Sequence, residues 1–432
     1  MRAAKILAKP LSLTQSALFY FDPPASPLIQ GLTMSLFSSV EMAPRDPILG
    51  LNEQFAADTS AIKVNLGVGV YFNDQGKLPL LECVQKAEQA MMAAPTARGY
   101  LPIDGIAAYD SAVKGLVFGA DSEAVKSNRV ATVQALGGTG GLKIGADFLK
   151  KLNPSAKVLI SDPSWENHRA LFTSAGFAVD TYAYYDAAAR GVNFPGMLQS
   201  LKAAAPGTIV VLHACCHNPT GYDITPEQWD EVVQVVKSNQ LTAFLDMAYQ
   251  GFGHGIAQDG AVIDKFLKAG LNFLVSTSFS KSFSLYGERV GALSVLCQSA
   301  DEASKVLSQL KIVIRTNYSN PPTHGGAVVA AVLNSPELRQ LWEKELGEMR
   351  VRIKTMRQSL VDGLKAAGIQ EDMSFITRQI GMFSYSGLSK EQMIRLRTEF
   401  GVYGTDTGRM CVAALNSHNI GHVCNAIATV LK

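Results

Sequence analysis

The chain has 432 residues, of which 47% are hydrophobic and 18% are charged, and it exceeds the ~250–300 residues at which single hydrophobic cores stop growing, so we expect two domains. The net charge of +2, without a long basic run, argues against a nucleic-acid-binding protein, and no apolar run reaches the ~18 residues of a membrane helix. The six cysteines show neither CxxC spacing nor the density of a disulfide scaffold, so we expect a reducing, cytoplasmic compartment and no metal site.

Residues 1–33 differ in composition from the rest of the chain. The charges before Asp22 are all basic, and the segment Pro23–Pro27 cannot continue a helix. A basic, acid-poor start is typical of a targeting peptide, but the apolar stretches are short and Met34 resembles a natural start. We therefore expect a disordered extension or a start-site artefact, with a transit peptide or an ordered arm as the alternatives.

The first elements precede any motif that carries chemistry. Apolar spacing predicts a short amphipathic helix over Asp46–Asp58, and alternation predicts a strand over Val64–Tyr71. Glycines such as Gly69 stand in that strand where a backbone can approach a ligand closely. Further helices are predicted over Pro79–Met92 and Ile106–Phe118.

Short apolar runs alternate with helical stretches in the middle of the chain. The runs are Val130–Leu136, Val158–Ile160, Ile209–His213, Ala243–Leu245 and Phe273–Val275. This alternation predicts an α/β fold with a mostly parallel sheet and helices on both faces. Each run ends in a polar cluster, and ligands of such sheets bind beyond the carboxyl ends of the strands. We therefore expect the clusters to face one crevice.

The C-terminal part begins with a long amphipathic helix predicted from Ser335 to about Ala366, a plausible hinge. Two strand-like runs, Met382–Tyr385 and Met410–Ala414, precede a last helix over His418–Leu431. We expect a large domain over residues 78–345 and a smaller α/β domain that combines residues 34–77 with residues 346–432.

A polar loop containing Lys281 lies between the run that ends at Val275 and a second apolar run, Val290–Cys297. Its amine can form an imine with an aldehyde, while the hydroxyls of Ser278 and Ser280 and the guanidinium of Arg289 can hold a phosphate. Pyridoxal phosphate (PLP) offers both groups. The alternative is an ordinary solvated loop lysine.

The glycine-rich segment Gly137–Gly141 precedes a helix predicted over Leu142–Lys151. The backbone N–H groups and the positive helix end make a phosphate seat, to which Gly138 and Thr139 would contribute. Dinucleotide-binding folds use the same device, and many such loops bind nothing, so this signal alone is weak.

Asp246 closes an apolar strand and can keep the pyridine nitrogen of PLP protonated, which makes the ring an electron sink. Tyr249 and Asn218 can donate to the ring's phenolic oxygen. Trp165 fits as an apolar plate against the ring, and His168, one turn later, could brace Asp246. The alternatives are a helix-capping role for Asp246 and plain core packing for Trp165.

The order and content of these clusters resemble the class I, fold-type I PLP-dependent aminotransferases, most closely their bacterial aromatic-amino-acid (tyrosine) and aspartate branch. The resemblance covers Met34 to Lys432. The motifs that carry it are Tyr100–Pro102, Gly137–Gly140, Asp162–His168, His213–Gly221, Asp246–Gly253, Ser278–Gly291, Arg315–Pro322 and Gly408–Met410.

The resemblance implies a fold with a seven-stranded type of sheet and a homodimer whose active site lies at the subunit interface. It assigns Lys281 to the imine and the proton shuttle, and Asp246 to the ring nitrogen. It implies the following further sites: phosphate binding by Gly138, Thr139, Ser278 and Arg289, with the partner's Tyr100; ring binding by Trp165, Asn218 and Tyr249; and substrate binding by Gly69, Trp165, Asn218, Arg409 and the partner's Arg315.

The resemblance also implies ping-pong transamination with 2-oxoglutarate as the amino acceptor. Arg315 favours aspartate and glutamate, whereas Val70, Phe72, Leu78 and Leu101 line the entrance segments with apolar groups, as in the aromatic branch. We therefore expect an enzyme that accepts tyrosine and phenylalanine as well as aspartate and glutamate. The alternative is an aspartate aminotransferase with little aromatic activity.

Other classes of protein share parts of this pattern. A PLP-dependent lyase or decarboxylase would keep the lysine and the aspartate but has less need of two carboxylate-binding arginines. A regulator with an aminotransferase-like domain would carry a DNA-binding domain, for which residues 1–33 are too short. A dinucleotide-dependent dehydrogenase is the reading if the glycine-rich segment has another role.

Overall fold

The computed structural model describes residues 35–46 and 48–432. The chain falls into two units, Met1–Arg45 and Asp46–Lys432. In the first unit the described residues contain one turn, in which the N–H of Ser38 donates to the carbonyl of Ser35. The predictions for residues 1–33 lie outside the described residues.

The second unit is built on a seven-stranded sheet, as the resemblance implied, with the strand order β2-β10-β9-β8-β7-β3-β4. The strands are β2 (Val130–Leu136), β3 (Lys157–Asp162), β4 (Ala178–Ala183), β7 (Ile209–His213), β8 (Thr242–Met247), β9 (Phe273–Ser278) and β10 (Val290–Leu296). Strand β10 runs antiparallel to both of its neighbours, β2 and β9, whereas the other pairs are parallel, so the sheet is mixed.

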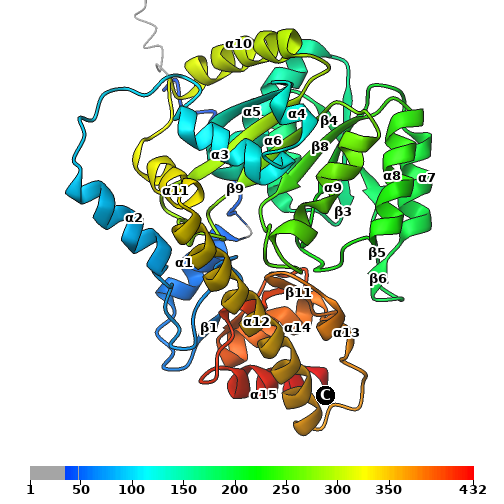
Figure 1. Cartoon of the computed structure of the whole chain (residues 1–432). Coiled ribbons are helices and arrows are strands. Elements are labelled where there is room, and N and C mark those ends of the chain that lie inside the picture. The colour runs from blue at the N-terminus through cyan, green and yellow to red at the C-terminus, as the bar shows by residue number, and fades with distance from the viewer. Residues whose placement is uncertain (1–34, 47) are drawn as a thin grey trace, which may run out of the picture. The chain divides into compact units, whose positions relative to one another are not determined.

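Helices cover both faces of this sheet (Figure 1). They include α3 (Ala107–Phe118), α4 (Glu123–Lys126), α5 (Gly137–Leu152), α6 (Glu166–Ser174), α7 (Phe194–Ala203), α8 (Pro226–Ser238), α9 (Ile256–Lys268), α10 (Ala300–Asn317) and α11 (His324–Asn334). Helix α2 (Glu82–Ala93) packs against α11. The alternation of side chains along a strand explains the two layers. In β8, Phe244 is buried with α5 and α6 on one face, while Ala243 and Leu245 join the core on the other.

Segments from both ends of this unit pair with each other. Strand β1 (Val64–Asn65) runs parallel to β12 (Val402–Tyr403), and β11 (Phe383–Tyr385) runs antiparallel to β13 (Arg409–Cys411). The helices of this layer are α1 (Leu49–Ala57), α13 (Phe375–Arg378), α14 (Lys390–Phe400) and α15 (Ile420–Leu431). A separate two-stranded sheet joins β5 (Tyr185–Asp186) to β6 (Gly191–Val192).

The long helix α12 (Pro336–Ala366) contacts α11 at one end of its course and α15 at the other (Figure 1). It begins where the sequence predicted, after the N-cap Ser335, whose hydroxyl accepts from the N–H of Leu338. The helix runs unbroken through residue 345, so the division of the chain at residues 77 and 345 stays a prediction.

Two predicted strands are wrong in extent. Only Val64–Asn65 of the predicted strand Val64–Tyr71 pairs with another strand, because the backbone beyond it bonds elsewhere; the N–H of Tyr71 donates to the Tyr286 hydroxyl at 2.9 Å. The run Met410–Ala414 ends its strand at Cys411 and continues as a 3₁₀ turn over Val412–Ala414.

Within the part of the chain that the structure describes, no helix combines the length and apolarity needed to cross a bilayer.

Candidate active site

A cavity of ≈ 270 Å³ lies at the carboxyl ends of β7, β8 and β9, beside the start of α5. It is lined by Val68, Gly69, Val70, Gly138, Thr139, Leu142, Trp165, His213, Asn218, Asp246, Ala248, Tyr249, Ser278, Ser280, Lys281, Tyr286 and Arg289. The predicted clusters therefore do face one crevice. A larger hollow of ≈ 510 Å³ beside α3 and α9 contains none of the predicted site residues.

Lys281 lies in the turn after β9 and lines the cavity. Its Nζ lies 4.8 Å from the centroid of the Tyr249 ring. Burial lowers the pKa of Lys281 to about 8; Asp246 opposes this shift, and Arg289 and Arg409 add to it. A substantial fraction of the amine is therefore neutral near pH 8, which makes it a competent nucleophile and base.

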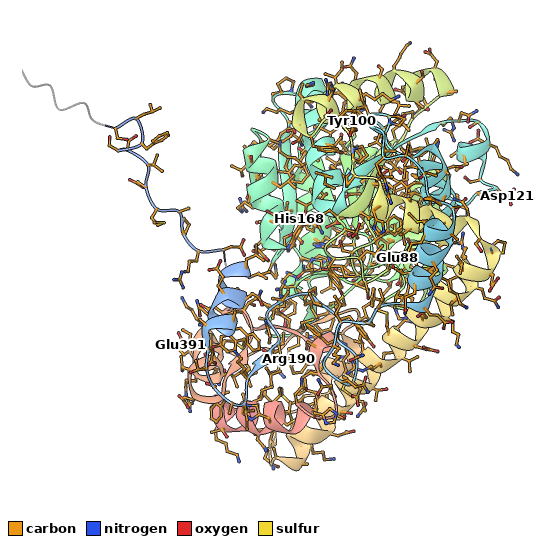
Figure 2. The ribbon with its side chains drawn as sticks, turned by 90° about the vertical axis from the view of Figure 1, so that its left-hand side faces the viewer. Glu88, Tyr100, Asp121, His168, Arg190 and Glu391 are labelled. Atoms are coloured by element: carbon orange, nitrogen blue, oxygen red, sulfur yellow. The ribbon has the colours of Figure 1, made fainter. Side chains whose placement is uncertain are left out.

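Asp246 lies in β8 directly opposite His213 of β7. The predicted contact with His168 is present: Nε2 of His168 lies 3.0 Å from Oδ2 of Asp246, and Nδ1 lies 2.9 Å from the Ser164 hydroxyl. Both side chains of the pair are buried, and Figure 2 labels His168 within the molecule.

The charge state of Asp246 follows from its neighbours. Burial raises its pKa, but the hydrogen bond from His168 and the electrostatic interactions with His168 and the Lys281 amine outweigh burial and hold the pKa below its usual value. The site thus keeps a buried carboxylate ionised and facing a cavity.

The glycine-rich segment is the first turn of α5 rather than a loop before it, so the predicted start of this helix at Leu142 is wrong. The glycines let the helix lie against the sheet: a Cβ at Gly141 would stand 2.6 Å from Ser276 Oγ and 2.8 Å from the carbonyl oxygen of Ala292. The first N–H groups of a helix have no intrahelical acceptor, and here they open on the cavity through Gly138 and Thr139.

Arg289 lies beside this helix end. A Cβ at Gly137 would stand 2.6 Å from the guanidinium, whose Nη1 donates to the Ser280 hydroxyl at 3.2 Å and to the carbonyl of Tyr286 at 3.0 Å. Ser278 ends β9 on the same rim. A cation, hydroxyl groups and free N–H groups therefore converge on one place, a suitable seat for a dianion.

Tyr249, Asn218 and Arg409 form a buried chain of polar contacts. Nδ2 of Asn218 donates to the Tyr249 hydroxyl at 3.5 Å, and Nη1 of Arg409 donates to Oδ1 of Asn218 at 3.0 Å. Burial raises the pKa of Tyr249 well above its ordinary value, so its hydroxyl stays protonated. Arg409 also donates to the carbonyl of Gly67 at 2.8 Å, and it lies behind the cavity lining rather than in it.

Besides Arg409, two further predicted site residues do not line the cavity and lie on the surface of the chain. Tyr100 is 96% exposed (Figure 2). Arg315 is exposed in the last turn of α10, where it bonds to the Ser319 hydroxyl. Neither is brought to Lys281 within a single chain.

Several lining residues were not predicted as site residues, among them Val68, His213 and Tyr286. Tyr286 stands in the same motif as Lys281, so proximity in sequence was the available signal. His213 is the last residue of a predicted strand; burial lowers its pKa to about 3, so its ring is neutral beside Asp246.

Comparison with known proteins identifies relatives along almost the whole of the second unit. The family model described as aminotransferase class I and II matches residues 61–427. An aspartate aminotransferase of Pseudomonas aeruginosa is 62% identical over 398 residues, which cover 92% of this chain and 100% of that protein. An aromatic-amino-acid aminotransferase of Escherichia coli is 50% identical over 397 residues, with the same coverage of both proteins.

Solved structures agree with this fold. The crystal structure of an aromatic-amino-acid aminotransferase from Burkholderia pseudomallei, covalently bound to pyridoxal phosphate, matches with a TM-score of 0.90 and 67% identity. The match covers 92% of this chain and 100% of that one.

Proposed function

Because the chain belongs to the class I and II aminotransferases, we propose that it transfers amino groups from tyrosine, phenylalanine, aspartate or glutamate to 2-oxoglutarate, with PLP as its cofactor. One observation carries the proposal: the Lys281 amine and the ionised Asp246 carboxylate line a single cavity whose rim is a seat for a dianion.

The residues present fit PLP. The cofactor has an aldehyde, a pyridine nitrogen, a phenolic oxygen and a phosphate, and the cavity offers an amine, a buried carboxylate, a protonated phenol and an anion seat. The apolar groups of Trp165 and Ala248 line the same space and would contact the faces of a flat ring. We assign the phosphate to Gly138, Thr139, Ser278 and Arg289, and the phenolic oxygen to Tyr249 and Asn218.

When bound, PLP supplies a carbon for covalent attachment and a protonated ring that accepts the electrons released at the α-carbon of the amino acid. Asp246, held ionised and oriented by His168, keeps the proton on the ring nitrogen. Lys281 anchors the cofactor at rest, and its amine, once released, moves the proton from the α-carbon. Arg409, fixed by Gly67 and Asn218, would bind the α-carboxylate through two parallel hydrogen bonds.

The working unit we propose is a homodimer. Tyr100 and Arg315 are both exposed and remote from their own cavity, which is the placement expected of residues that complete the partner's site. Tyr100 would contact the phosphate and Arg315 the distal carboxylate of a dicarboxylic substrate. We propose a cytoplasmic location, in keeping with six free, buried cysteines.

Replacing Lys281 with alanine tests the central assignment. We expect Lys281→Ala to lose the absorbance of covalently attached cofactor and to lower turnover by about 10⁴-fold or more, since both anchor and base are removed. Absorbance spectra and steady-state rates of the purified protein measure both effects. Substitution of the nearby surface residue Lys143, paired with Asp147, is the control and should change neither. A Lys281→Ala protein with wild-type turnover would refute the mechanism.

A second candidate is an aspartate aminotransferase with little aromatic activity, favoured by the 62% identity to the Pseudomonas aeruginosa protein. The apolar side chain of Val70, which lines the cavity, favours the dual specificity instead, since burying a phenyl ring contributes ~2 kcal/mol. Comparison of kcat/KM for tyrosine, phenylalanine and aspartate separates the two. We expect values within about a hundredfold; an aspartate value higher by several orders of magnitude would establish the second candidate.

A further inference from the structure

Arg357 of α12 is a buried cation outside the catalytic cavity. It is 2% exposed, and among the residues that the structure describes no carboxylate lies within ion-pair distance of it. Burial lowers its pKa to about 10, so the guanidinium remains charged at neutral pH. A buried charge without a counter-ion is costly unless it satisfies several hydrogen-bond acceptors, which points to a specific role.

The guanidinium of Arg357 binds one loop. Its Nη1 donates to the carbonyl of Ile376 at 3.2 Å, and its Nη2 donates to the carbonyl of Gly381 at 2.9 Å and to that of Phe383. The side chain of Gln379 closes the same loop by donating to the carbonyl of Tyr385 at 3.0 Å. The two terminal nitrogens of the Arg357 guanidinium, which together form a fork, therefore fix the backbone from residue 376 to residue 383.

The opposite side of this loop rests on the segment that carries Asn218. The N–H of Ile380 donates to the carbonyl of Gly221 at 2.7 Å. Gly381 has a φ of +76°, and a Cβ there would stand 2.5 Å from the Cβ of Cys216. The loop is thus held between Arg357 and the cavity wall, with little freedom to shift.

Phe383, at the end of this loop, contacts residues in and behind the cavity lining. Its ring centroid lies 4.5 Å from the Arg409 guanidinium and 5.8 Å from the Tyr249 ring, and a Cβ at Gly69 would stand 2.8 Å from its Cζ. The ring face therefore supports the guanidinium through a cation–π contact, while Gly67 and Asn218 hold its nitrogen atoms.

We propose that Arg357 is a positioning residue that sets the loop of residues 376–383, so that Phe383 orients Arg409 for the carboxylate of the substrate. This inference rests on the proposed function, because it assumes that Arg409 binds a carboxylate. It predicts a defect in carboxylate binding without a defect in cofactor attachment.

The test measures equilibrium binding of 3-phenylpropanoate, an aromatic carboxylate without an amine, to the holoenzyme through the cofactor's absorbance. In Arg357→Met, which removes the fork, we expect the Kd to rise about tenfold or more. The KM for the amino acid should rise similarly, whereas kcat, cofactor content and the resting spectrum should change little. Arg357→Lys keeps the charge but loses the planar fork, so its Kd should lie between those of the wild type and Arg357→Met.

The matched control is Arg350→Met. Arg350 lies on the same helix and donates to the carbonyl of Gly251 at 2.7 Å, and among the residues that the structure describes no hydrogen bond joins it to residues 376–383. We expect its Kd to stay within about twofold of the wild-type value. An equal loss of affinity for 3-phenylpropanoate in Arg350→Met and Arg357→Met would show that Arg357 has only a general structural role and would overturn the inference.

A second variant keeps the proposal testable if Arg357→Met does not fold. Phe383→Leu removes the ring and leaves the loop's backbone bonds in place, so it should raise the Kd as Arg357→Met does. The variant that carries both substitutions should have a Kd no higher than that of the single variant with the higher Kd, because both substitutions act through the contact between Phe383 and Arg409. Additive losses, or unchanged binding in Phe383→Leu, would overturn the inference. Absent transamination by the wild type would instead overturn the proposed function, because the binding measurement requires no turnover.

Discussion

The Lys281 amine is the group in the cavity whose reactivity depends most on pH. Burial lowers its pKa to about 8, and Asp246 acts against this shift. Below pH 8 the amine is protonated and cannot attack an aldehyde; above it the neutral amine predominates. We expect the rate at which the apoprotein attaches PLP to rise with pH and to reach half its maximum near pH 8, followed by absorbance after mixing.

The variant Asp246→Asn tests the effect of the carboxylate on the pH dependence of PLP attachment. Removing the carboxylate removes the interaction that stabilises the protonated amine, so the midpoint should move to lower pH. Asp147→Asn, which removes the surface partner of Lys143 on α5, should leave the midpoint unchanged. A midpoint near the ordinary value of 10.5 in the wild type would contradict the effect of burial.

Contacts between site residues could be predicted from the sequence where one motif contains both the reactive side chain and the residues that contact it. The contact between His168 and Asp246 joins two motifs, yet it was predictable because Asp246 lies at the carboxyl end of β8 and His168 follows the carboxyl end of β3, a parallel strand of the same sheet. The bond between Tyr71 and Tyr286 was not predictable, since it joins residues 215 positions apart through irregular backbone. The assigned roles of the site residues remain predictions.

At the scale of elements, helix α5 is the part of the fold that most directly sets the anion seat. A Cβ at Gly141 would meet Ser276 Oγ at 2.6 Å and the backbone oxygen of Ala292 at 2.8 Å, and the backbone cannot turn away. We expect Gly141→Ala to push α5 off the sheet and to destabilise the protein by about 1–3 kcal/mol. The affinity for PLP should fall as well, measured by denaturation of the apoprotein and by cofactor titration.

Gly347→Ala provides the control for a glycine replaced within a helix. A Cβ at Gly347 in α12 would meet only Nη2 of Arg350, at 3.6 Å. Because alanine favours the helix, this change should stabilise the protein by about 0.5–1 kcal/mol and leave the PLP affinity unaltered. Equal stability and equal PLP affinity of Gly141→Ala and the wild type would show that α5 does not need this close approach.

Apolar runs and caps predicted many elements closely, such as β2, β7 and α12, because each is buried or capped by its own residues. Edge strand β4 was not predicted, since its burial alternates and polar residues interrupt its run. Helices α7 to α11 and α14 were not delimited by the sequence either. The glycines at the start of α5 read as a loop because their fit depends on the sheet beneath them.

At the scale of the whole molecule, the proposed exchange of residues between subunits predicts the behaviour of mixed dimers. Arg315→Ala and Lys281→Ala would each abolish the use of aspartate in a pure dimer. A hybrid would hold one intact site, with Lys281 from one chain and Arg315 from the other. Refolding the two variants in equal amounts should restore about a quarter of wild-type aspartate activity, because roughly half of the dimers are hybrids.

The alternative arrangement gives a different result. If Arg315 served the cavity of its own chain, neither site of the hybrid would be complete and the mixture would stay inactive towards aspartate. Mixing Lys281→Ala with Asp246→Asn is the control, since both residues line one cavity and no hybrid site would be intact. Activity in that control mixture would contradict the assignment of the two residues to one site.

The overall architecture followed from the alternation of apolar runs and helices and from the family resemblance. The order of the strands did not follow from the runs, because periodicity gives no information on which strands are neighbours. The antiparallel β10, between β2 and β9, shows this most clearly, since its own pattern is that of any buried strand.

The pairing of β1 with β12 has a consequence for biosynthesis. Val64 aligns with Val402, so the ribosome must add more than three hundred residues before the first strand meets its partner. Ordering so long an intervening chain is entropically expensive and slow, and the nascent segment stays without its native neighbour meanwhile. The hydrogen bonds of Arg409 to Gly67 and Asn218 can therefore form only after the ribosome has added residue 409.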